Sequence, residues 1–416
     1  MTDIQVYAAI DDKDVLAGTL YVHRRRGHES ASFAYDQAYL AHPGAYALDP
    51  LLPLTSGAHQ TRAGQTLFGA FSDCAPDRWG RTLIKRREAV LARTEGRVAR
   101  SLGEVEFLLG VRDDLRQGAL RFRQGGGPFL AEDGQGVPAL TDLPSLLELA
   151  DKAERGTADV TDLQHLVRAG SSLGGARPKA HVRGANGRIA IAKFPSTSDD
   201  TWNVMAWEKV ALDLAKASRI TVPESRLLDL AGRHVLVVDR FDRSADGGRI
   251  GYASAMTMLE ASDGDARSYL EIAEVIETTS RRATAELQEL WRRIAFSVLI
   301  SNTDDHLRNH GFLHESGESW RLAPAFDLNP NPDPGLKYLS TNINEGDNTA
   351  SVDLVLDVAE YFRLTAPQAA GVLGEIVDAV SQWRAVAARH GLSAAEIDGM
   401  QRAFGTLDEV AASRVL

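Results

Sequence analysis

Apolar and polar positions alternate near the start of the chain. The runs 4–10 (IQVYAAI) and 16–23 (LAGTLYVH) each alternate and are rich in β-branched and aromatic residues, and the polar segment DDKDV separates them. Two such runs around a short polar segment predict a β-hairpin. Residues 79–93 have apolar side chains at helical spacing and predict a helix.

A segment rich in glycine and proline, 124–138, predicts a linker or loop. Beyond it the pattern predicts, in chain order, helices at 143–154 and 160–169, a Gly-rich loop at 171–179, a strand at 188–194, a helix at 203–217 and a buried strand at 234–239. Residues after about 253 are mostly helical in pattern, and the exception is a hairpin expected at 311–323. The pattern therefore predicts an α+β protein with three regions, 1–123, 124–245 and 246–416.

The composition is that of a globular protein with a large core. The 416 residues are 44% hydrophobic and 25% charged. The longest apolar stretch is broken by Ser297 and is much shorter than the roughly 20 residues of a membrane span. The acidic first residues do not match a signal peptide, and Cys74 is the only cysteine. These features predict a cytosolic protein without an intrachain disulfide.

The net charge of −11 argues against a protein devoted to binding nucleic acid. Residues 1–123 carry +2 and residues 124–416 carry −13. The first region contains a run of basic residues: Arg78, Arg81, Lys85, Arg86, Arg87, Arg93, Arg97 and Arg100. Helical spacing would place the last three on one face. That face is either solvated or a minor contact for DNA or an acidic partner.

The strongest candidate for chemistry is SNTDDHLRNHGFL at 301–313, followed by AFDLNP at 325–330. Asp304 and Asn309 have the spacing of the catalytic Asp and the metal-binding Asn in a kinase catalytic loop. The expected hairpin then leads to Asp327, in the position of the second metal ligand. Amide and carboxylate oxygens suit Mg²⁺. The alternative is that Asp304, Asp305 and Asn309 cap a helix that ends near residue 300.

Three residues upstream fit the same chemistry. Lys193 lies in the alternating strand 188–194, where ATP phosphates would supply the charge partner that a half-buried lysine needs. Glu208 lies on the next helix, where a kinase places the glutamate that pairs with this lysine. Asp239 ends the strand 234–239, where a nucleotide-contacting hinge would lie. The alternatives are a lysine that faces water on an edge strand and a solvated helix acid.

The Gly-rich loop GSSLGGARPK at 170–179 could bind phosphates through its backbone N–H groups and Lys179. Gly174 and Gly175 leave the backbone free to approach a ligand closely. The loop matches neither the Walker A pattern nor the kinase G-x-G-x-x-G pattern.

Two rival motifs occur in the same regions. Residues 170–174 match the G-x-S-x-G elbow of serine hydrolases, with Ser172 as the nucleophile. That elbow follows a buried strand, whereas 160–169 is helical in pattern. His306 and His310 have the spacing of a metal-binding pair, but they lack the glutamate of H-E-x-x-H and a clear third ligand. We expect His306 to support the catalytic loop instead.

Several short motifs, taken together, resemble the HipA-type serine/threonine kinases, the toxins of bacterial toxin–antitoxin modules. They are the N-terminal hairpin, CAPDRWGR at 74–81, GALRF at 118–122, SSLGGARPK, AKFP at 192–195, VDRFDR at 238–243, NTDDHLRN and AFDLNP. The resemblance spans nearly the whole chain. The family pattern N-x-D-x-H-x-(K)-N falls on Asn302, Asp304, His306, Arg308 and Asn309, with Arg308 in place of the usual lysine.

The resemblance implies a role for each of these residues. The catalytic aspartate would be Asp304, the Mg²⁺ ligands Asn309 and Asp327, and the lysine on the ATP phosphates Lys193. The autophosphorylated serine would be Ser172, with Ser171 beside it as the other candidate. Arg177-Pro178 replaces the Gln-Glu found in some members, so the phosphate contacts of the loop are expected to differ.

The resemblance further implies a two-lobed protein-kinase-like fold with an additional N-terminal β-rich subdomain and an all-helical C-terminal lobe. It implies ATP and Mg²⁺ as cofactors, a protein substrate, often an aminoacyl-tRNA synthetase in the family, and a small helix-turn-helix antitoxin of the HipB type. DNA would be bound mainly through the antitoxin. Two functions stay open, an active protein kinase and a binding module that acts chiefly as a corepressor.

Overall fold

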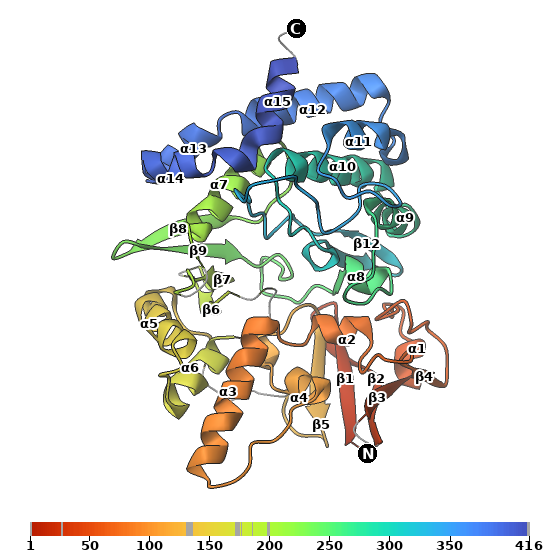
Figure 1. Ribbon diagram of the computed structural model, residues 1–416. Helices are drawn as coiled ribbons and strands as arrows, with labels where there is room; N and C mark the ends of the chain where they lie inside the picture. Colours follow the sequence, from red (N-terminus) through yellow and green to blue (C-terminus); the bar gives the residue numbers. More distant parts are fainter. Residues whose placement is uncertain are drawn as a thin grey trace. The chain divides into compact units, whose positions relative to one another are not determined.

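The computed structural model describes residues 2–25, 28–129, 136–170, 175, 177–184, 186–197 and 200–413 (Figure 1). Its contacts divide the chain into two compact units. Unit 1 comprises Met1–Asp199, Asp239–Glu260 and Leu313–Glu318, and unit 2 comprises Asp200–Val238, Ala261–Phe312 and Ser319–Leu416. Among the described residues, no helix has both the length and the apolar character that a membrane crossing requires.

Unit 1 begins with the predicted hairpin. Strands β1 (Thr2–Ile10) and β2 (Lys13–Arg25) pair antiparallel, and the two residues between them, Asp11 and Asp12, both have positive φ. Such a two-residue turn matches the twist of the strands, and Asp tolerates the left-handed backbone better than most residues. The strands belong to a five-stranded sheet in the order β4-β3-β2-β1-β5, the red and orange strands of Figure 1.

The other elements of unit 1 agree with the sequence pattern only in part. They are β3 (His28–Tyr35), α1 (Gln37–Leu40), β4 (Ala58–Gln60), α2 (Gly69–Asp73), α3 (Arg78–Thr94), α4 (Glu104–Leu109), β5 (Leu120–Gln124), α5 (Leu143–Glu154), α6 (Val160–Ala169), β6 (Lys179–Arg183), β7 (Ile189–Lys193), β10 (Tyr252–Ser254) and α8 (Ala255–Met258). Helices α3, α5 and α6 confirm the predictions for 79–93, 143–154 and 160–169. Strand β7 confirms the alternating run, whereas strands β3, β4, β5 and β6 and the short helices α1, α2 and α4 were not predicted.

The basic run on α3 differs from the prediction. Helix α3 ends at Thr94, so Arg97 and Arg100 are not on a helical face with Arg93. Both contact the carboxylate of Glu88, with an Arg100 Nη2–Oε2 distance of 3.2 Å. Hydrogen bonds from Arg97, which has the larger effect, and from Arg100 hold the pKa of Glu88 below its usual range. The expectation of one shared basic face is therefore wrong, because these arginines neutralise a buried acid instead.

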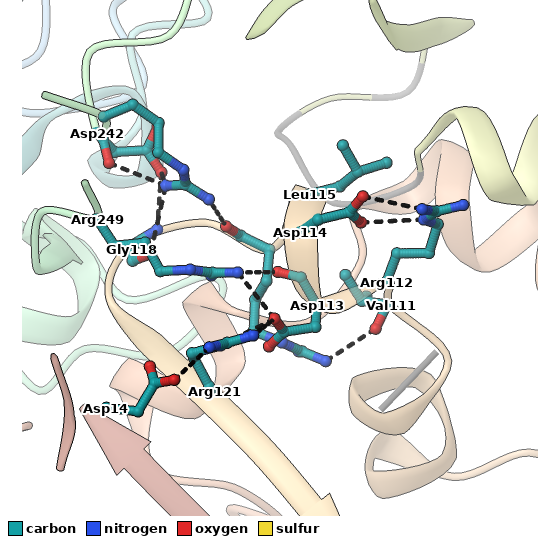
Figure 2. A network of polar contacts seen from close by, with 12 residues as sticks. Asp14, Val111, Arg112, Asp113, Asp114, Leu115, Gly118, Arg121, Asp242 and Arg249 are labelled. Atoms are coloured by element: carbon teal, nitrogen blue, oxygen red, sulfur yellow. Dashed lines mark hydrogen bonds and ion pairs between the residues drawn. The ribbon is translucent and has the colours of Figure 1, made fainter. Parts of the chain in front are cut away.

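A buried network of ion pairs explains the VDRFDR motif (Figure 2). The carboxylate of Asp242 accepts hydrogen bonds from Arg240 at 2.6 and 2.8 Å, from Arg243 at 2.8 Å and from the backbone N–H of Gly118 at 2.8 Å. Arg240 also donates to the carbonyl of Leu115 at 2.7 Å. Burial alone would raise the pKa of Asp242, but the two arginines hold it below its ordinary value.

A second aspartate continues this network. Asp113 accepts from Arg121 at 2.9 Å and from Arg249 at 2.9 Å, and its side chain is 1% exposed. Arg116, fully buried, donates to three backbone carbonyls, and burial lowers its pKa to about 10. Segments 112–121 and 240–249 are thus fastened together by charge-assisted hydrogen bonds, the strong kind.

The single cysteine is predicted to be unreactive. Cys74 is 3% exposed, its Sγ lies 3.5 Å from the carbonyl oxygen of Gln117, and burial raises the pKa of the thiol to about 12. Because the thiolate is the nucleophile, we expect slow reaction with a disulfide reagent at pH 8. Labelling kinetics with and without denaturant would test this, and equal rates under both conditions would contradict it.

Unit 2 is predominantly helical. Its elements are α7 (Val204–Ala217), β8 (Ser225–Leu230), β9 (Arg233–Asp239, whose last residue falls in unit 1), α9 (Tyr269–Thr279), α10 (Ala283–Leu299), β11 (Gly311–Ser316, whose residues from Leu313 on fall in unit 1), β12 (Ser319–Leu322), α11 (Val352–Asp357), α12 (Ala366–Val380), α13 (Trp383–Arg389), α14 (Ala394–Gly399) and α15 (Gly405–Ser413). The hairpin expected at 311–323 is present, and the N–H of Ala323 donates to the carbonyl of Gly311 at 2.8 Å. The regular elements of the C-terminal region are therefore helices apart from this hairpin and the short β10, and residues 323–351 between β12 and α11 form no helix or named strand.

Aromatic side chains pack the helices of unit 2 together. The rings of Trp383 and Phe404 stack at 4.2 Å between centroids, and Trp207 of α7 lies 6.0 Å from Trp383. Trp291 of α10 is fully buried and donates to the carbonyl of Val355 in α11 at 2.9 Å. Large buried rings of this kind dominate core energetics, so α10 is held firmly where the candidate catalytic loop leaves it.

Candidate active site

The candidate catalytic loop begins where α10 ends. The backbone N–H groups of Ser301 and Asn302 donate to the carbonyls of Val298 and Ser297, at 3.2 and 2.8 Å. Ser301 has a φ of 52°, a left-handed conformation that turns the chain away from the helix. A helix C-terminus needs donors, and backbone N–H groups already supply them here. The alternative in which Asp304 and Asn309 cap this helix is therefore not supported.

Asp304, His306 and Asn309 lie in one compact turn. The N–H of His306 donates to the carbonyl of Asp304 at 2.9 Å, and the N–H of Asn309 donates to the carbonyl of His306 at 2.8 Å. Asn309 is 8% exposed, and its Nδ2 donates to the carbonyl of Asp304 at 2.9 Å. Because Nδ2 is the donor atom, this bond fixes which way the amide oxygen of Asn309 points. Asp304 itself is exposed.

The AFDLNP segment is tied to this turn. The side-chain oxygen of Asn302 accepts from the N–H of Asn329 at 3.1 Å, and Asn331 Nδ2 donates to Thr303 Oγ1 at 2.9 Å. Asn329 Nδ2 also donates to Asp327 Oδ1 at 3.2 Å. Asp327 has a φ of 58°, a sparsely populated conformation for a residue other than glycine. Residues 302–309 and 327–331, which are separate in sequence, thus form one site.

A buried aspartate next to Asp304 supports the turn. The carboxylate of Asp305, 4% exposed, accepts from Tyr269 at 2.6 Å and from Ser297 at 3.2 Å, and His310 Nε2 lies 3.1 Å from it. Burial alone would raise the pKa of Asp305, but His310 and the two hydroxyl donors lower it. Its carbonyl accepts from Thr341 at 2.7 Å. The sequence analysis missed this role, although a second acid beside Asp304 was its signal.

The metal-binding alternative for His306 and His310 finds no support. The ring of His310 faces Asp305 and packs edge-on against Tyr269, with 5.5 Å between ring centroids. Within the described part of the chain, no group of three histidine, cysteine, aspartate or glutamate side chains could hold a metal ion. His306 directly precedes the turn Leu307–Asn309, and its supporting role stays a prediction.

Two candidate phosphate-binding lysines lie opposite each other in unit 1. Strands β6 and β7 pair antiparallel with Lys179 against Lys193, so both side chains are on one face of the hairpin. Lys193 is half-buried, whereas Lys179 is 4% exposed. Lys179 Nζ lies 2.7 Å from a carboxylate oxygen of Asp77, a partner that the sequence analysis did not assign. Its signal was the unexplained CAPDRWGR motif.

The Gly-rich loop is only partly described. Gly175 is exposed and has a φ of +107°, which favours glycine. The predictions for Ser171, Ser172 and Gly174 lie outside the described residues. Helix α6 extends to Ala169, so a helix and not a buried strand precedes this loop. The context required for a hydrolase elbow is therefore missing.

Glu208 and Asp239 lie on the helix and the strand that the sequence predicts for them. Glu208 lies on α7 and is 2% exposed, so the alternative of a solvated helix acid is wrong. A buried glutamate requires a hydrogen-bonding or charged partner. Asp239 is the last residue of β9, as the sequence predicts. Lys193 belongs to unit 1 and Glu208 to unit 2, and their pairing stays a prediction.

Two family models match separate parts of the chain. A model of the HipA-like C-terminal domain matches residues 171–384, just over half of the chain and including the Gly-rich loop, Asp304 and Asp327. A model of the HipA N-terminal domain matches residues 9–104. The chain belongs to the HipA family. The family predicted from the motifs is thus confirmed.

Curated relatives of this HipA-family chain are named as kinases. "Putative kinase Y4mE" of Sinorhizobium fredii is 23% identical over 335 residues, which is 72% of each chain. A "Putative kinase" of Haemophilus influenzae is 27% identical over 135 residues, 29% of this chain and 39% of the relative. The chain matches less than two fifths of the length of the Haemophilus relative, and also less than two fifths of the length of "Putative kinase Y4dM" of S. fredii.

A solved structure shares the fold. HipA of Shewanella oneidensis MR-1, in a complex with HipB and operator DNA, has a TM-score of 0.65 with 15% identity, covering 97% of this chain and 95% of that one. At this identity the similarity shows the fold alone. The predicted fold class, a kinase-like α+β arrangement with an additional N-terminal β-rich part, is confirmed.

Proposed function

We propose that this HipA-family chain is a serine/threonine-protein kinase that uses ATP and Mg²⁺ and acts as the toxin of a type II toxin–antitoxin module. The observation that carries the proposal is the joining of two separate segments by the Asn302–Asn329 hydrogen bond. The exposed Asp304, the amide of Asn309 and the carboxylate of Asp327 belong to the two segments that this bond joins. That combination is the one which phosphoryl transfer requires.

The oxygen atoms of this site fit a magnesium ion. Asn309 offers an amide oxygen and Asp327 a carboxylate, both hard ligands of the kind Mg²⁺ prefers. The hydrogen bonds to Asp304 and from Asn329 restrict the orientation of these two side chains. A bound Mg²⁺ would neutralise phosphate charge and hold the nucleotide for transfer.

Side chains of this protein would then bind the substrate hydroxyl and the ATP phosphates. Asp304, exposed beside the metal ligands, would orient a serine or threonine hydroxyl and take up its proton, while His306 shapes the turn. Lys193, aligned by the buried Glu208, would hold ATP phosphates, and Asp239 would contact the nucleotide at the hinge. Lys179 and the backbone of Gly174 and Gly175 would add phosphate contacts.

We further propose partners and a cellular role. The name of the Shewanella complex motivates a HipB-like helix-turn-helix antitoxin and DNA bound mainly through it. A net charge of −11 agrees with this, because tight DNA binding needs clustered basic residues. The substrate would be a cytoplasmic protein such as an aminoacyl-tRNA synthetase. Ser172, or Ser171, would be an autophosphorylation site.

Phosphoproteomics after expression of the wild type and of Asp304→Ala tests the proposal. New phosphoserine or phosphothreonine sites that depend on Asp304 would identify substrates and support an active kinase. Identical phosphoproteomes, together with operator repression retained by both proteins in the presence of antitoxin, would favour the corepressor function instead.

Asp327→Ala is expected to weaken Mg²⁺-dependent ATP binding more than Asp304→Asn does. A metal ligand acts in the ground state, whereas a general base acts mainly during transfer. Calorimetric titration with ATP at fixed Mg²⁺, repeated without Mg²⁺, would compare the two variants. Equal nucleotide affinity of both variants would contradict the metal role of Asp327.

A further inference from the structure

Asp77 uses its two carboxylate oxygens for two different contacts. Oδ1 accepts from the backbone N–H of Gly80 at 2.7 Å and so caps the N-terminus of α3. Oδ2 lies 2.7 Å from Nζ of Lys179, and each of the two side chains is 5% exposed. This residue therefore connects the start of a helix near residue 80 to the strand that follows the Gly-rich loop.

The ion pair also lies against the loop itself. A side-chain carbon added to Gly175 would lie 3.2 Å from Nζ of Lys179, so the ammonium group is packed against the backbone there. The carbonyl of Gly175 accepts a long hydrogen bond, 3.4 Å, from the N–H of Trp79. The described end of the Gly-rich loop is thus held at the first turn of α3 by both Trp79 and the Asp77–Lys179 pair.

Charge explains why Lys179 needs this partner. Lys179 lies directly opposite Lys193 in the β6–β7 hairpin, and like charges in that position repel. Burial raises the pKa of Asp77, and the neighbouring Lys179 acts against that rise, so each charge favours the other. A buried lysine that loses its anion favours the neutral amine and regains rotamer freedom. A neutral, mobile lysine binds phosphate poorly.

We propose that Asp77 is a positioning residue of the nucleotide site, which holds the ammonium of Lys179 beside the backbone of Gly175 and in place for the phosphates of a nucleoside triphosphate. This inference rests on the proposed function, because it requires Lys179 to lie at the phosphates. It assigns a nucleotide-binding role to the N-terminal subdomain through the first turn of α3. It also gives the conspicuous CAPDRWGR motif a chemical reason.

The substitution Asp77→Asn removes the negative charge of Asp77 but keeps a side chain that can cap helix α3. Asparagine caps helices as well as aspartate does, so the contact with Gly80 is kept while the ion pair is lost. Asp159→Asn is the matched control, because Asp159 caps α6 through the N–H of Asp162 at 2.8 Å. Lys179→Met and the double variant with Asp77→Asn complete a thermodynamic cycle.

The measurements are the Kd for ATP by calorimetry and the melting temperature of each protein without nucleotide. We expect Asp77→Asn to raise the Kd by about tenfold, which corresponds to about 1.4 kcal/mol of binding free energy. Asp159→Asn should leave the Kd for ATP within about twofold of the wild-type value. A difference of that size is the usual deviation from additivity for substitutions at distant sites. In the Lys179→Met background, Asp77→Asn should change the Kd no further.

Unchanged or tighter ATP binding by Asp77→Asn would overturn the inference, and so would an equally large effect in the Lys179→Met background. If Asp77→Asn melts far below the wild type, Asp77→Ser provides a second variant with a good helix cap. Failure of the wild type to bind ATP would overturn the proposed function together with this role. Normal binding by the wild type and an insensitive Asp77→Asn would overturn only the role of Asp77.

Discussion

Asp304→Asn is expected to lower the rate of phosphoryl transfer by about 10²–10⁴, the usual contribution of a general base. The amide keeps the size of the carboxylate but cannot accept the proton of the attacking hydroxyl. The backbone of the turn should persist, because the contacts to His306 and Asn309 use the carbonyl of Asp304 and not its side chain. Autophosphorylation measured with radiolabelled ATP at saturating Mg²⁺ gives the rate.

The same experiment needs a control for a general loss of acidic charge. Asp357→Asn serves this purpose, since Asp357 is an exposed acid at the end of α11 in the same unit. We expect wild-type phosphorylation from the control and a wild-type melting temperature from both variants. Near wild-type autophosphorylation by purified Asp304→Asn would exclude Asp304 as the base.

Local sequence signals predicted most of the fold. Helix α6 was predictable because its apolar residues recur at helical spacing. The first hairpin was predictable because two strand-like runs lie on both sides of a short polar segment. In β6 the first four residues are buried, so no alternation marks this strand. Arg97 and Arg100 were misplaced because the helix stops at Thr94, two residues before Gly96, which has positive φ.

The candidate site was predictable to the extent that its residues are close in sequence. The spacing of Asp304 and Asn309 was visible in a single motif, as was the later Asp327. The partners of Asp305 and Lys179 were not, because Tyr269 and Asp77 are 36 and 102 residues away. Side-chain contacts across such separations depend on tertiary packing, which hydrophobic periodicity does not encode. In the sequence, these contacts were indicated only by motifs without an assigned role, such as CAPDRWGR around Asp77.

Asp242→Ala is expected to destabilise the protein by about 3–5 kcal/mol, the typical cost of removing one partner from a buried ion pair. The substitution leaves the guanidinium groups of Arg240 and Arg243 buried without their carboxylate. It also removes the acceptor of the Gly118 N–H, and Figure 2 labels both Asp242 and Gly118. Asp14→Ala is the control, because that carboxylate is 36% exposed and its partner Arg121 keeps its ion pair with Asp113. A partly exposed pair contributes about 1 kcal/mol or less.

The pH dependence separates the charge of Asp242 from simple loss of packing. Since its pKa is lower in the folded protein than in the unfolded chain, its contribution is fully present above the unfolded pKa, about 4, and is lost as the pH falls toward the folded pKa. Urea unfolding at pH 7 and near pH 3 should therefore show a smaller difference between wild type and Asp242→Ala at the acidic pH. A difference of constant size would mean that Asp242 stabilises by shape, and that the two arginines do not depend on its charge.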